Sequence, residues 1–325
     1  MLPLVRDRIK QEAPDRPASG ATLITSFVED EFLPWVDANK RPATANGYRK
    51  LWNKHLKIHF AGMKLADYRP YNATRFLGQL AAKMTGHSVA HVRALMSCIF
   101  AHAVADGRVD SNPIRDASLR VQPKASKGTP HYTPAEMLAI LKALANHPQA
   151  QVAMALGFFA GLRTAEIAGL QWRDVSDDWS TINVQRSVWR GQAAHCKTET
   201  SKAPTPLIEP LRSALQNFKW LQTVMDPAQH VLVNSLLRPL DLAGLAHRII
   251  RPTLADCKLE WKGYYAGRRG LATLLANTNP QAAMGMLRHA TLNTTQGFYI
   301  KAIPAATLDA MNALETSLIE EVRDK

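Results

Sequence analysis

Apolar side chains recur every three or four positions along residues 21–120, which is the spacing of amphipathic helices. This spacing predicts four helices, and Thr44 is expected to cap the second of them. The third covers about residues 71–83, and the fourth ends at Asp106-Gly107. Because no part of the stretch alternates between apolar and polar residues, we expect it to form an all-helical domain.

A second region opens with a strong helix signal. Thr133 can cap a helix, Pro134 suits its first position, and Glu136 lies in its first turn. Further helices are expected at about residues 149–160 and from Thr164 onward.

The period then changes from helical to alternating. Residues 181–188 alternate and predict a strand, while the polar, threonine-rich segment 195–207 is expected to supply the rest of a small sheet or hairpin. Helices resume from Pro210. The predicted fold class is therefore mainly α with a small β-sheet, of the α+β kind.

Proline and glycine divide the chain. Residues 1–20 are polar with no apolar period and are expected to form a mobile tail. The segment VQPKASKGTP is rich in proline, glycine and lysine, which is typical of an exposed, basic linker. The predicted organisation is a tail (1–20), a helical domain (21–120), a linker (121–131) and a second domain with a C-terminal helix (132–325).

The charge balance narrows the class of partner. Forty Lys and Arg against 27 Asp and Glu leave a formal charge of +13, which attracts a polyanion such as nucleic acid. A basic but unrelated soluble protein is the alternative on charge alone. No apolar run approaches the roughly 20 residues that cross a bilayer. The start of the chain carries charges where a signal peptide needs an apolar stretch, so a cytoplasmic protein is expected.

Metal and disulfide chemistry find no support in the cysteines. Cys98, Cys196 and Cys257 lie far apart, with no CxxC pair, so neither a zinc site nor a disulfide framework is predicted. No phosphate-binding loop is present either, and no cofactor is expected.

Candidate chemistry lies in charged residues within apolar surroundings. Arg163 and Glu166 are three residues apart in a segment rich in phenylalanine and leucine, and a buried arginine needs an anionic partner. Arg268 and Arg269 enter an apolar helix and raise the same requirement. A surface ion pair is the plainer interpretation of each segment taken alone.

The order of these segments resembles a known family. GLRTAEIAGLQWRDV, a lysine in the sheet region, YAGRRGLAT and LRHATLNTTQGFY follow one another as in the catalytic domain of the tyrosine recombinases, the phage-integrase family. The stretch from Thr44 and Tyr48 to Pro70, and IFAHAVADGRVDSNPI before the linker, resemble that family's core-binding domain. The resemblance covers roughly residues 20–305.

The resemblance implies a role for each matching residue. The implied catalytic residues are two arginines, a lysine of the small sheet, a histidine and a nucleophilic tyrosine: Arg163, Arg268, Lys197, His289 and Tyr299. Lys202 competes with Lys197, and Glu166 matches the family's acidic residue beside the first arginine. Contacts to DNA are expected from Thr44, Tyr48, Lys127 and Arg269.

Three positions depart from the family's pattern. Tyr265 occupies the position of a histidine three residues before Arg268, and a tyrosine there can still donate a hydrogen bond. Arg288 replaces the glycine of the family's Leu-Gly-His box. Tyr299 lies ten residues after His289, with Phe298 at position nine, and no other tyrosine follows Tyr265.

The implied activity is site-specific recombination through a phosphotyrosine, without ATP or metal. The implied partners are double-stranded DNA with inverted repeats, in the nucleoid, and three further copies of the chain in a homotetramer. A C-terminal helix at about residues 306–322 carries an apolar stripe that packs either on a neighbouring copy or on its own domain. A type IB topoisomerase-like enzyme and a non-catalytic DNA-binding relative are the alternatives.

Overall fold

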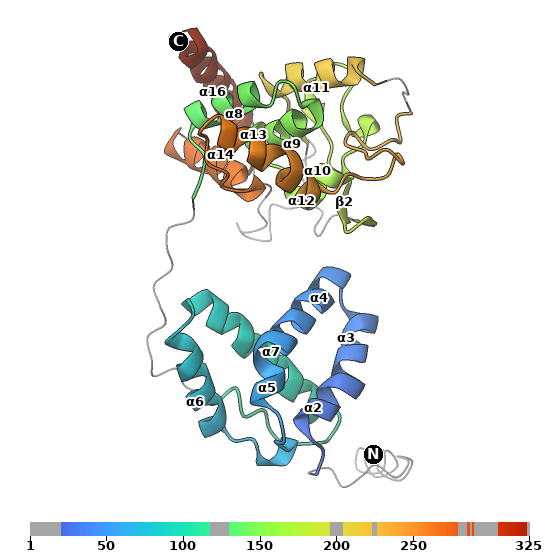
Figure 1. The fold of residues 1–325 in the computed structure, drawn as a ribbon, viewed down its shortest axis with the longest axis vertical. Coiled ribbons are helices and arrows are strands. Elements are labelled where there is room, and N and C mark those ends of the chain that lie inside the picture. Colours follow the sequence, from blue (N-terminus) through green and yellow to red (C-terminus); the bar gives the residue numbers. More distant parts are fainter. Residues whose placement is uncertain are drawn as a thin grey trace. The chain divides into compact units, whose positions relative to one another are not determined.

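The computed structural model describes residues 21–117, 130–195, 204–222, 226–278, 285–286, 288 and 305–323. The chain divides into two compact units, Met1–Gly128 and Thr129–Lys325 (Figure 1). Each unit has its own hydrophobic core. The expected tail and all of the expected linker except Pro130 and His131 lie outside the described residues. The proposed domain limits therefore stay a prediction.

The first unit is helical, and the four predicted helices are confirmed. Their bounds, with π-helical and 3-10 segments marked η, are α2 (Ile24–Ser26), η1 (Phe27–Phe32) and α3 (Leu33–Asn39), then α4 (Pro42–Leu51), η2 (Trp52–Leu56) and α5 (Lys57–His59), then η3 (Leu65–Asp67), α6 (Pro70–Ala81) and α7 (Gly86–Ala105). Within residues 21–117, the extended backbone pairing is limited to an isolated bridge between Leu23 and Lys64.

The start of α4 differs from the prediction. Arg41 takes the N-cap position and Pro42 the first helical position, so Thr44 lies inside the first turn and caps nothing. A proline suits that place because its fixed φ is already helical and its missing N–H would have no partner in the helix. Thr44 and Tyr48, four residues apart, lie on the same side of α4.

Helix α7 is the centre of the first unit. Its inward residues are fully or almost fully buried: Val92, Leu95, Met96, Ile99 and Phe100. Among the described residues, α7 alone is long and apolar enough to match a membrane span, which the sequence had not suggested. Its apolar residues belong to the core of a folded unit, which accounts for its composition.

The second unit is also mainly helical over its described residues. The helices there are α8 (Pro134–Ala143), α9 (Pro148–Phe159), α10 (Thr164–Gly169), η4 (Trp172–Asp174), α11 (Leu211–Trp220), α12 (Leu242–Leu245), η6 (Ala246–Ile250), α13 (Arg251–Asp256), α14 (Tyr264–Thr278) and α16 (Ala305–Arg323). The predicted start of α8 is confirmed. The Thr133 hydroxyl accepts from the Glu136 N–H, and the Glu136 carboxylate accepts from the Thr133 N–H.

The strands form two small antiparallel sheets. β1 (Thr181–Ile182) pairs with β4 (Thr205–Pro206), and β2 (Arg186–Trp189) pairs with β3 (Gln192–His195) through a tight turn. The prediction of one continuous strand over 181–188 is wrong. β1 ends at Ile182 and β2 begins at Arg186; the Asn183 N–H donates to the carbonyl of Asp174, next to an isolated antiparallel bridge between Val175 and Ile182.

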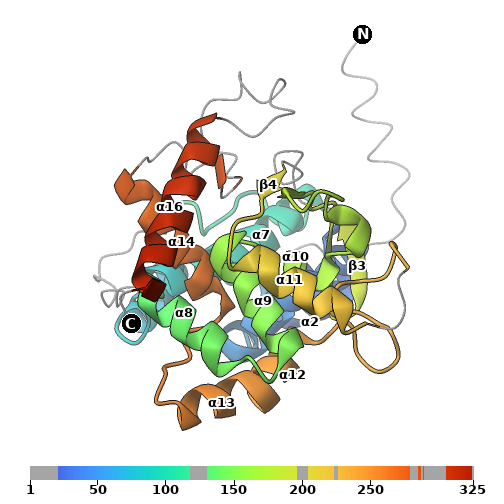
Figure 2. The same ribbon diagram turned by 90° about the horizontal axis from the view of Figure 1, so that it is seen from above.

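Helix α9 organises the core of the second unit. It lies among α8, α10, α11 and α14 and contacts each of them (Figure 2). Most of its residues are buried. Helix α16 lies beside α14, and its apolar stripe packs on its own unit through Met311, Leu314 and Leu318. The positions that matter for chemistry lie where α9 ends, where α10 begins and along α14.

Candidate active site

The turn between α9 and α10 builds one side of the candidate site. Gly161 has a φ of +59°, a left-handed conformation that glycine adopts without steric cost, and it lets the chain leave α9 sharply. Arg163 then takes the N-cap position of α10. Its N–H donates to Glu166 Oε2 at 2.9 Å, so Glu166 closes a capping box and lies at the positive end of the helix.

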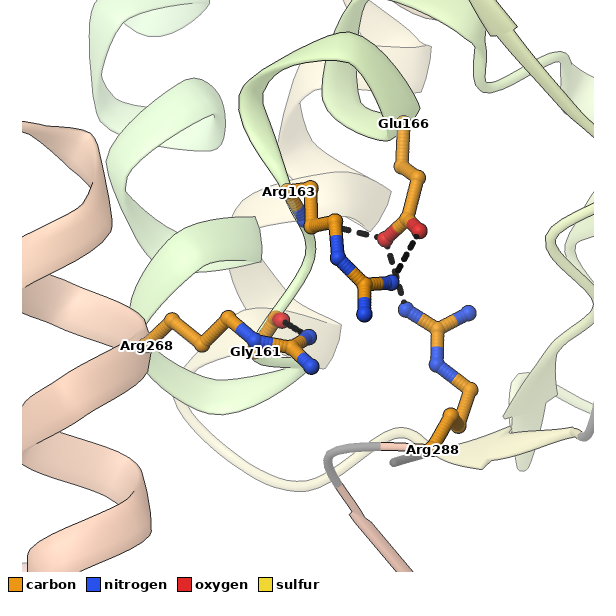
Figure 3. A network of polar contacts seen from close by, with 5 residues as sticks. All are labelled: Gly161, Arg163, Glu166, Arg268 and Arg288. Carbon is orange, nitrogen blue, oxygen red and sulfur yellow. Dashed lines mark hydrogen bonds and ion pairs between the residues drawn. The ribbon is translucent and has the colours of Figure 1, made fainter. Parts of the chain in front are cut away.

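Glu166 is a buried carboxylate shared between two arginines. Arg163 Nη1 donates to Oε1 at 2.7 Å, and Arg288 Nη2 donates to Oε2 at 2.7 Å (Figure 3). The Glu166 side chain is 5% exposed, whereas that of Arg163 is 37% exposed. Arg163 is therefore held at one end by the carboxylate and opens to solvent at the other.

Close packing of α14 against α9 brings in a third arginine. A Cβ on Gly267 would lie 2.7 Å from Phe158 Cδ1, so only a glycine permits this approach. The next residue, Arg268, is 2% exposed, and its Nη1 donates to the carbonyl oxygen of Gly161. Its guanidinium points toward those of Arg163 and Arg288 (Figure 3).

Among the described side chains that influence Arg268, positive charge predominates. Burial lowers the pKa of Arg268 to about 10, with further lowering by Arg163 and Arg288, and Glu166 opposes them more weakly. Burial by itself would raise the pKa of Glu166, but Arg288 and the hydrogen bonds from Arg163 outweigh it and hold that pKa below its usual range. At neutral pH all four side chains are charged, and together they carry +2 (three guanidiniums less one carboxylate).

Comparison with known proteins gives relatives over most of the chain. No model of a known protein family matches it. "Putative prophage phiRv2 integrase" of Mycobacterium tuberculosis is 29% identical over 209 residues, covering 59% of this chain and 54% of that protein. "Tyrosine recombinase XerC-like" of Caldanaerobacter subterraneus is 21% identical over 318 residues, covering 87% and 80%. The chain spans about half the length of the phiRv2 integrase.

Solved structures share the fold. The Tn1549 transposon integrase in complex with transposon right end DNA gives a TM-score of 0.67 at 17% identity, over 90% of this chain and 99% of that chain. A lambda integrase dimer bound to a COC′ core site gives 0.60 at 18% identity, over 82% and 94%. These similarities join the sequence relatives and the ordered motifs in one assignment. The chain is similar in sequence to integrases and tyrosine recombinases of the phage-integrase family, and it shares the fold of solved integrases.

Two of the family's motif residues meet here, together with the acidic residue beside the first. Arg163 and Arg268 lie 105 positions apart in the chain (268 less 163), yet both point toward the same space beside Glu166 (Figure 3). Arg288 stands at the family's glycine position, and its side chain lies beside them (Figure 3). Its backbone is left-handed, with a φ of +51°. The sequence had indicated added charge at Arg288 but not its contact with Glu166. The glycine position was the available signal, because it marks a left-handed backbone next to the site.

Tyr265 occupies a different environment from Arg268 on the same helix. Its side chain is 49% exposed, and the Arg269 guanidinium lies 5.4 Å from the centre of its ring. Arg269 Nε also donates to the carbonyl of Pro130 at 2.9 Å. A role for Tyr265 at the phosphate, and one for Arg269 at DNA, stay predictions.

The two residues of the first unit predicted to contact DNA lie on α4. Thr44 is exposed, while Tyr48 is partly buried and stacks on Phe32 at 6.4 Å between ring centres. The Tyr48 hydroxyl lies 3.7 Å from Cys98 Sγ, and burial raises the pKa of Tyr48 to about 12. Tyr48 is thus held by contacts within its own unit, and Thr44 lies one turn before it on α4.

Several predicted site residues lie outside the described residues: Lys127, Lys197, Lys202, His289 and Tyr299. Their roles stay predictions from the family resemblance. Within the ranges that the structure describes, no group of three or more His, Cys, Asp or Glu residues is placed to hold a metal ion.

Proposed function

We propose that this chain is a site-specific DNA recombinase that cuts and rejoins strands through a 3′-phosphotyrosine at Tyr299, and so integrates or excises a mobile element. The observation that carries the proposal is the convergence of Arg163 and Arg268 on one positively charged site. A scissile phosphodiester is an anion that gains charge in its pentacoordinate transition state. Guanidiniums fixed in advance stabilise that added charge.

The proposed chemistry is a reversible phosphoryl transfer. The Tyr299 oxygen attacks phosphorus, the bond from phosphorus to the 5′-oxygen breaks, and the leaving oxygen takes a proton from Lys197. A phenol is a poor nucleophile at its ordinary pKa of about 10, and nearby cations favour its phenolate. His289 is expected to bond the phosphate or to assist the transfer of the phenolic proton, and Tyr265 to donate a hydrogen bond.

Rejoining reverses these steps. The 5′-hydroxyl of a second strand attacks the phosphotyrosine, the tyrosine oxygen leaves, and Lys197 regains its proton. Because the covalent intermediate keeps the energy of the broken bond, the exchange of strands consumes neither ATP nor a metal-activated water.

DNA and further copies of the chain are the proposed partners. The formal charge of +13 suits a polyanion. The solved relatives include integrases bound to DNA and a lambda integrase tetramer bound to a Holliday junction. We infer duplex DNA with inverted repeats as the substrate and a homotetramer as the active assembly. The cytoplasmic nucleoid is the proposed place of action, and Thr44, Tyr48, Lys127 and Arg269 are the proposed DNA contacts.

The experiment is a trap for the covalent intermediate. A nicked duplex carrying the candidate attachment site from beside the gene is incubated, without metal, with the wild type and with Tyr299→Phe. A protein–DNA adduct on a denaturing gel is expected for the wild type alone. An adduct with the variant would refute Tyr299 as the nucleophile. Binding without any adduct would favour a non-catalytic relative, and cleavage without preference for inverted repeats would favour a type IB topoisomerase-like enzyme.

A further inference from the structure

Arg288 is an unusual residue for its place in the chain. It stands where the family's box has glycine, and it keeps a left-handed backbone with a φ of +51°. Such a conformation is uncommon for a residue with a Cβ, and it persists where the surrounding contacts stabilise it. That side chain is 1% exposed.

The Arg288 side chain binds Glu166. Arg288 Nη2 donates to Glu166 Oε2 at 2.7 Å, and the same oxygen accepts the N–H of Arg163 at 2.9 Å. The second carboxylate oxygen accepts Arg163 Nη1 at 2.7 Å. Glu166 thus links the two arginines, and Arg288 restricts the rotation of the carboxylate to which the Arg163 guanidinium is bound (Figure 3).

We propose that Arg288 is a positioning residue for strand cleavage, which holds Glu166 so that Glu166 holds the Arg163 guanidinium at the scissile phosphate. The inference rests on the proposed function. Arg288 does not itself contact the phosphate in this scheme, because it is buried and bound to the carboxylate. Arg163, with its more exposed side chain, is the group that reaches the phosphate.

A purely structural tether between the segment at Arg288 and α10 would show the same contact. The dependence of cleavage on pH separates the two. The charged groups facing Glu166 are Arg163 from its own helix, Arg288, and Arg268 from α14. Burial raises the pKa of Glu166, and Arg288 is the strongest influence that lowers it. Without Arg288, the pKa of Glu166 is expected to rise, so that lowering the pH weakens its hold on Arg163 more than in the wild type.

The experiment measures single-turnover cleavage of the nicked duplex from pH 5.5 to 9 for four forms of the full chain. These are the wild type, Arg288→Gly, Glu166→Gln and the double variant. Arg288→Gly is expected to cut the cleavage rate by about 10- to 100-fold at neutral pH, because a small misplacement of a catalytic group costs this much. The loss is expected to grow at pH 5.5, while the concentration of DNA that half-saturates cleavage stays unchanged.

Two comparisons isolate the link through Glu166. The double variant is expected to cleave no more slowly than Glu166→Gln alone, because the two residues act through one contact. In the Glu166→Gln background, adding Arg288→Gly should leave the pH profile of cleavage unaltered, because the substituted glutamine has no titrating carboxyl group. A shift of the profile in this background would instead come from another group, such as His289. Arg288→Lys, which keeps one donor and the charge, is expected to restore part of the rate.

The opposite results overturn the proposal. Wild-type rates and pH profile for Arg288→Gly, or losses that multiply in the double variant, would leave Arg288 without a positioning role. If the glycine variant fails to fold, Arg288→Met keeps the buried stem and takes its place with the same criteria. If the wild type forms no Tyr299 adduct, the proposed function is overturned as well. If the wild type forms the adduct and Arg288→Gly changes neither the rate nor the pH profile, this inference alone is overturned.

Discussion

Two buried arginine–carboxylate clusters lie in the second unit, and they differ in their balance of charge. At Asp174, one carboxylate meets one guanidinium, that of Arg186, and the other contact is the N–H of Gln171 at 2.8 Å. At Glu166, one carboxylate meets Arg163 and Arg288, and Arg268 points into the same space.

The difference distinguishes an ion pair that neutralises itself from a group of described side chains with excess positive charge, which suits the proposed anionic substrate. The pair of Arg186 and Asp174 neutralises itself and ties β2 to η4, since a buried charge needs a partner. The group around Glu166 carries more positive charge than its carboxylate offsets, and the lowered pKa of Arg268 records the repulsion from its neighbours as well as its burial. Adding a phosphate would relieve that repulsion.

Replacing Arg268 is expected to have the largest effect. Arg268→Ala should slow cleavage of the nicked duplex by about 10²- to 10³-fold, as the loss of one fixed group that stabilises transition-state charge does in other enzymes. Single-turnover rates at saturating DNA measure the loss, and circular dichroism checks that the variant is folded. A folded variant within tenfold of the wild-type rate would contradict a role at the phosphate.

Breaking the balanced cluster should affect stability instead. Arg186→Met leaves the carboxylate of Asp174, which is 3% exposed, without its cation and is expected to lower the free energy of unfolding by about 3 kcal/mol. Chemical denaturation measures this change. Cleavage per folded molecule should stay within threefold of the wild type, and Asp174→Asn in the same chain should recover part of the stability. If Arg186→Met kept wild-type stability but cleaved DNA poorly, the pair of Arg186 and Asp174 would have a role in cleavage and not only in stability.

Disturbing the close packing of α14 against α9 is expected to have a smaller effect on stability and cleavage. Gly267→Ala places a Cβ 2.7 Å from Phe158 Cδ1 and is expected to lower the free energy of unfolding by about 1–3 kcal/mol. It should also slow cleavage, because Arg268 moves with the helix. The matched control is Gly47→Ala in α4, where an added Cβ meets nothing within 4 Å. There the same change should stabilise the protein by about 0.5–1 kcal/mol.

The dependence of stability on pH tests the Glu166 cluster without DNA. The folded state lowers the pKa of Glu166, so its contribution is present above the unfolded pKa of about 4.3 and is lost as pH falls through the folded value. The thermal unfolding temperature should therefore fall more steeply below about pH 4.5 in the wild type than in Glu166→Gln. The same change at the exposed Glu320 serves as the control. If the unfolding temperature depended on pH equally in the wild type and in Glu166→Gln, the lowered pKa of Glu166 in the folded state would be contradicted.

Local signals in the sequence predicted much of this architecture. The capping box of Thr133 and Glu136 and the pairing of Arg163 with Glu166 each span three residues, so spacing alone indicates them. The break between Ile182 and Arg186 was missed because local alternation does not reveal the contacts that Ile182 and Asn183 make with Val175 and Asp174. Spacing also could not place Arg288 on Glu166, since the two are 122 residues apart and meet only in the folded unit.

The most direct test of the unbalanced cluster is a neutral phosphate. A nicked duplex with a methylphosphonate at the scissile position lacks the charge that Arg268 is proposed to offset. On this substrate, the penalty of Arg268→Ala relative to the wild type should shrink from about 10²-fold or more to less than about tenfold, while the small effect of Arg186→Met stays the same on both substrates. An equal penalty for Arg268→Ala on the charged and the neutral substrate would contradict the account.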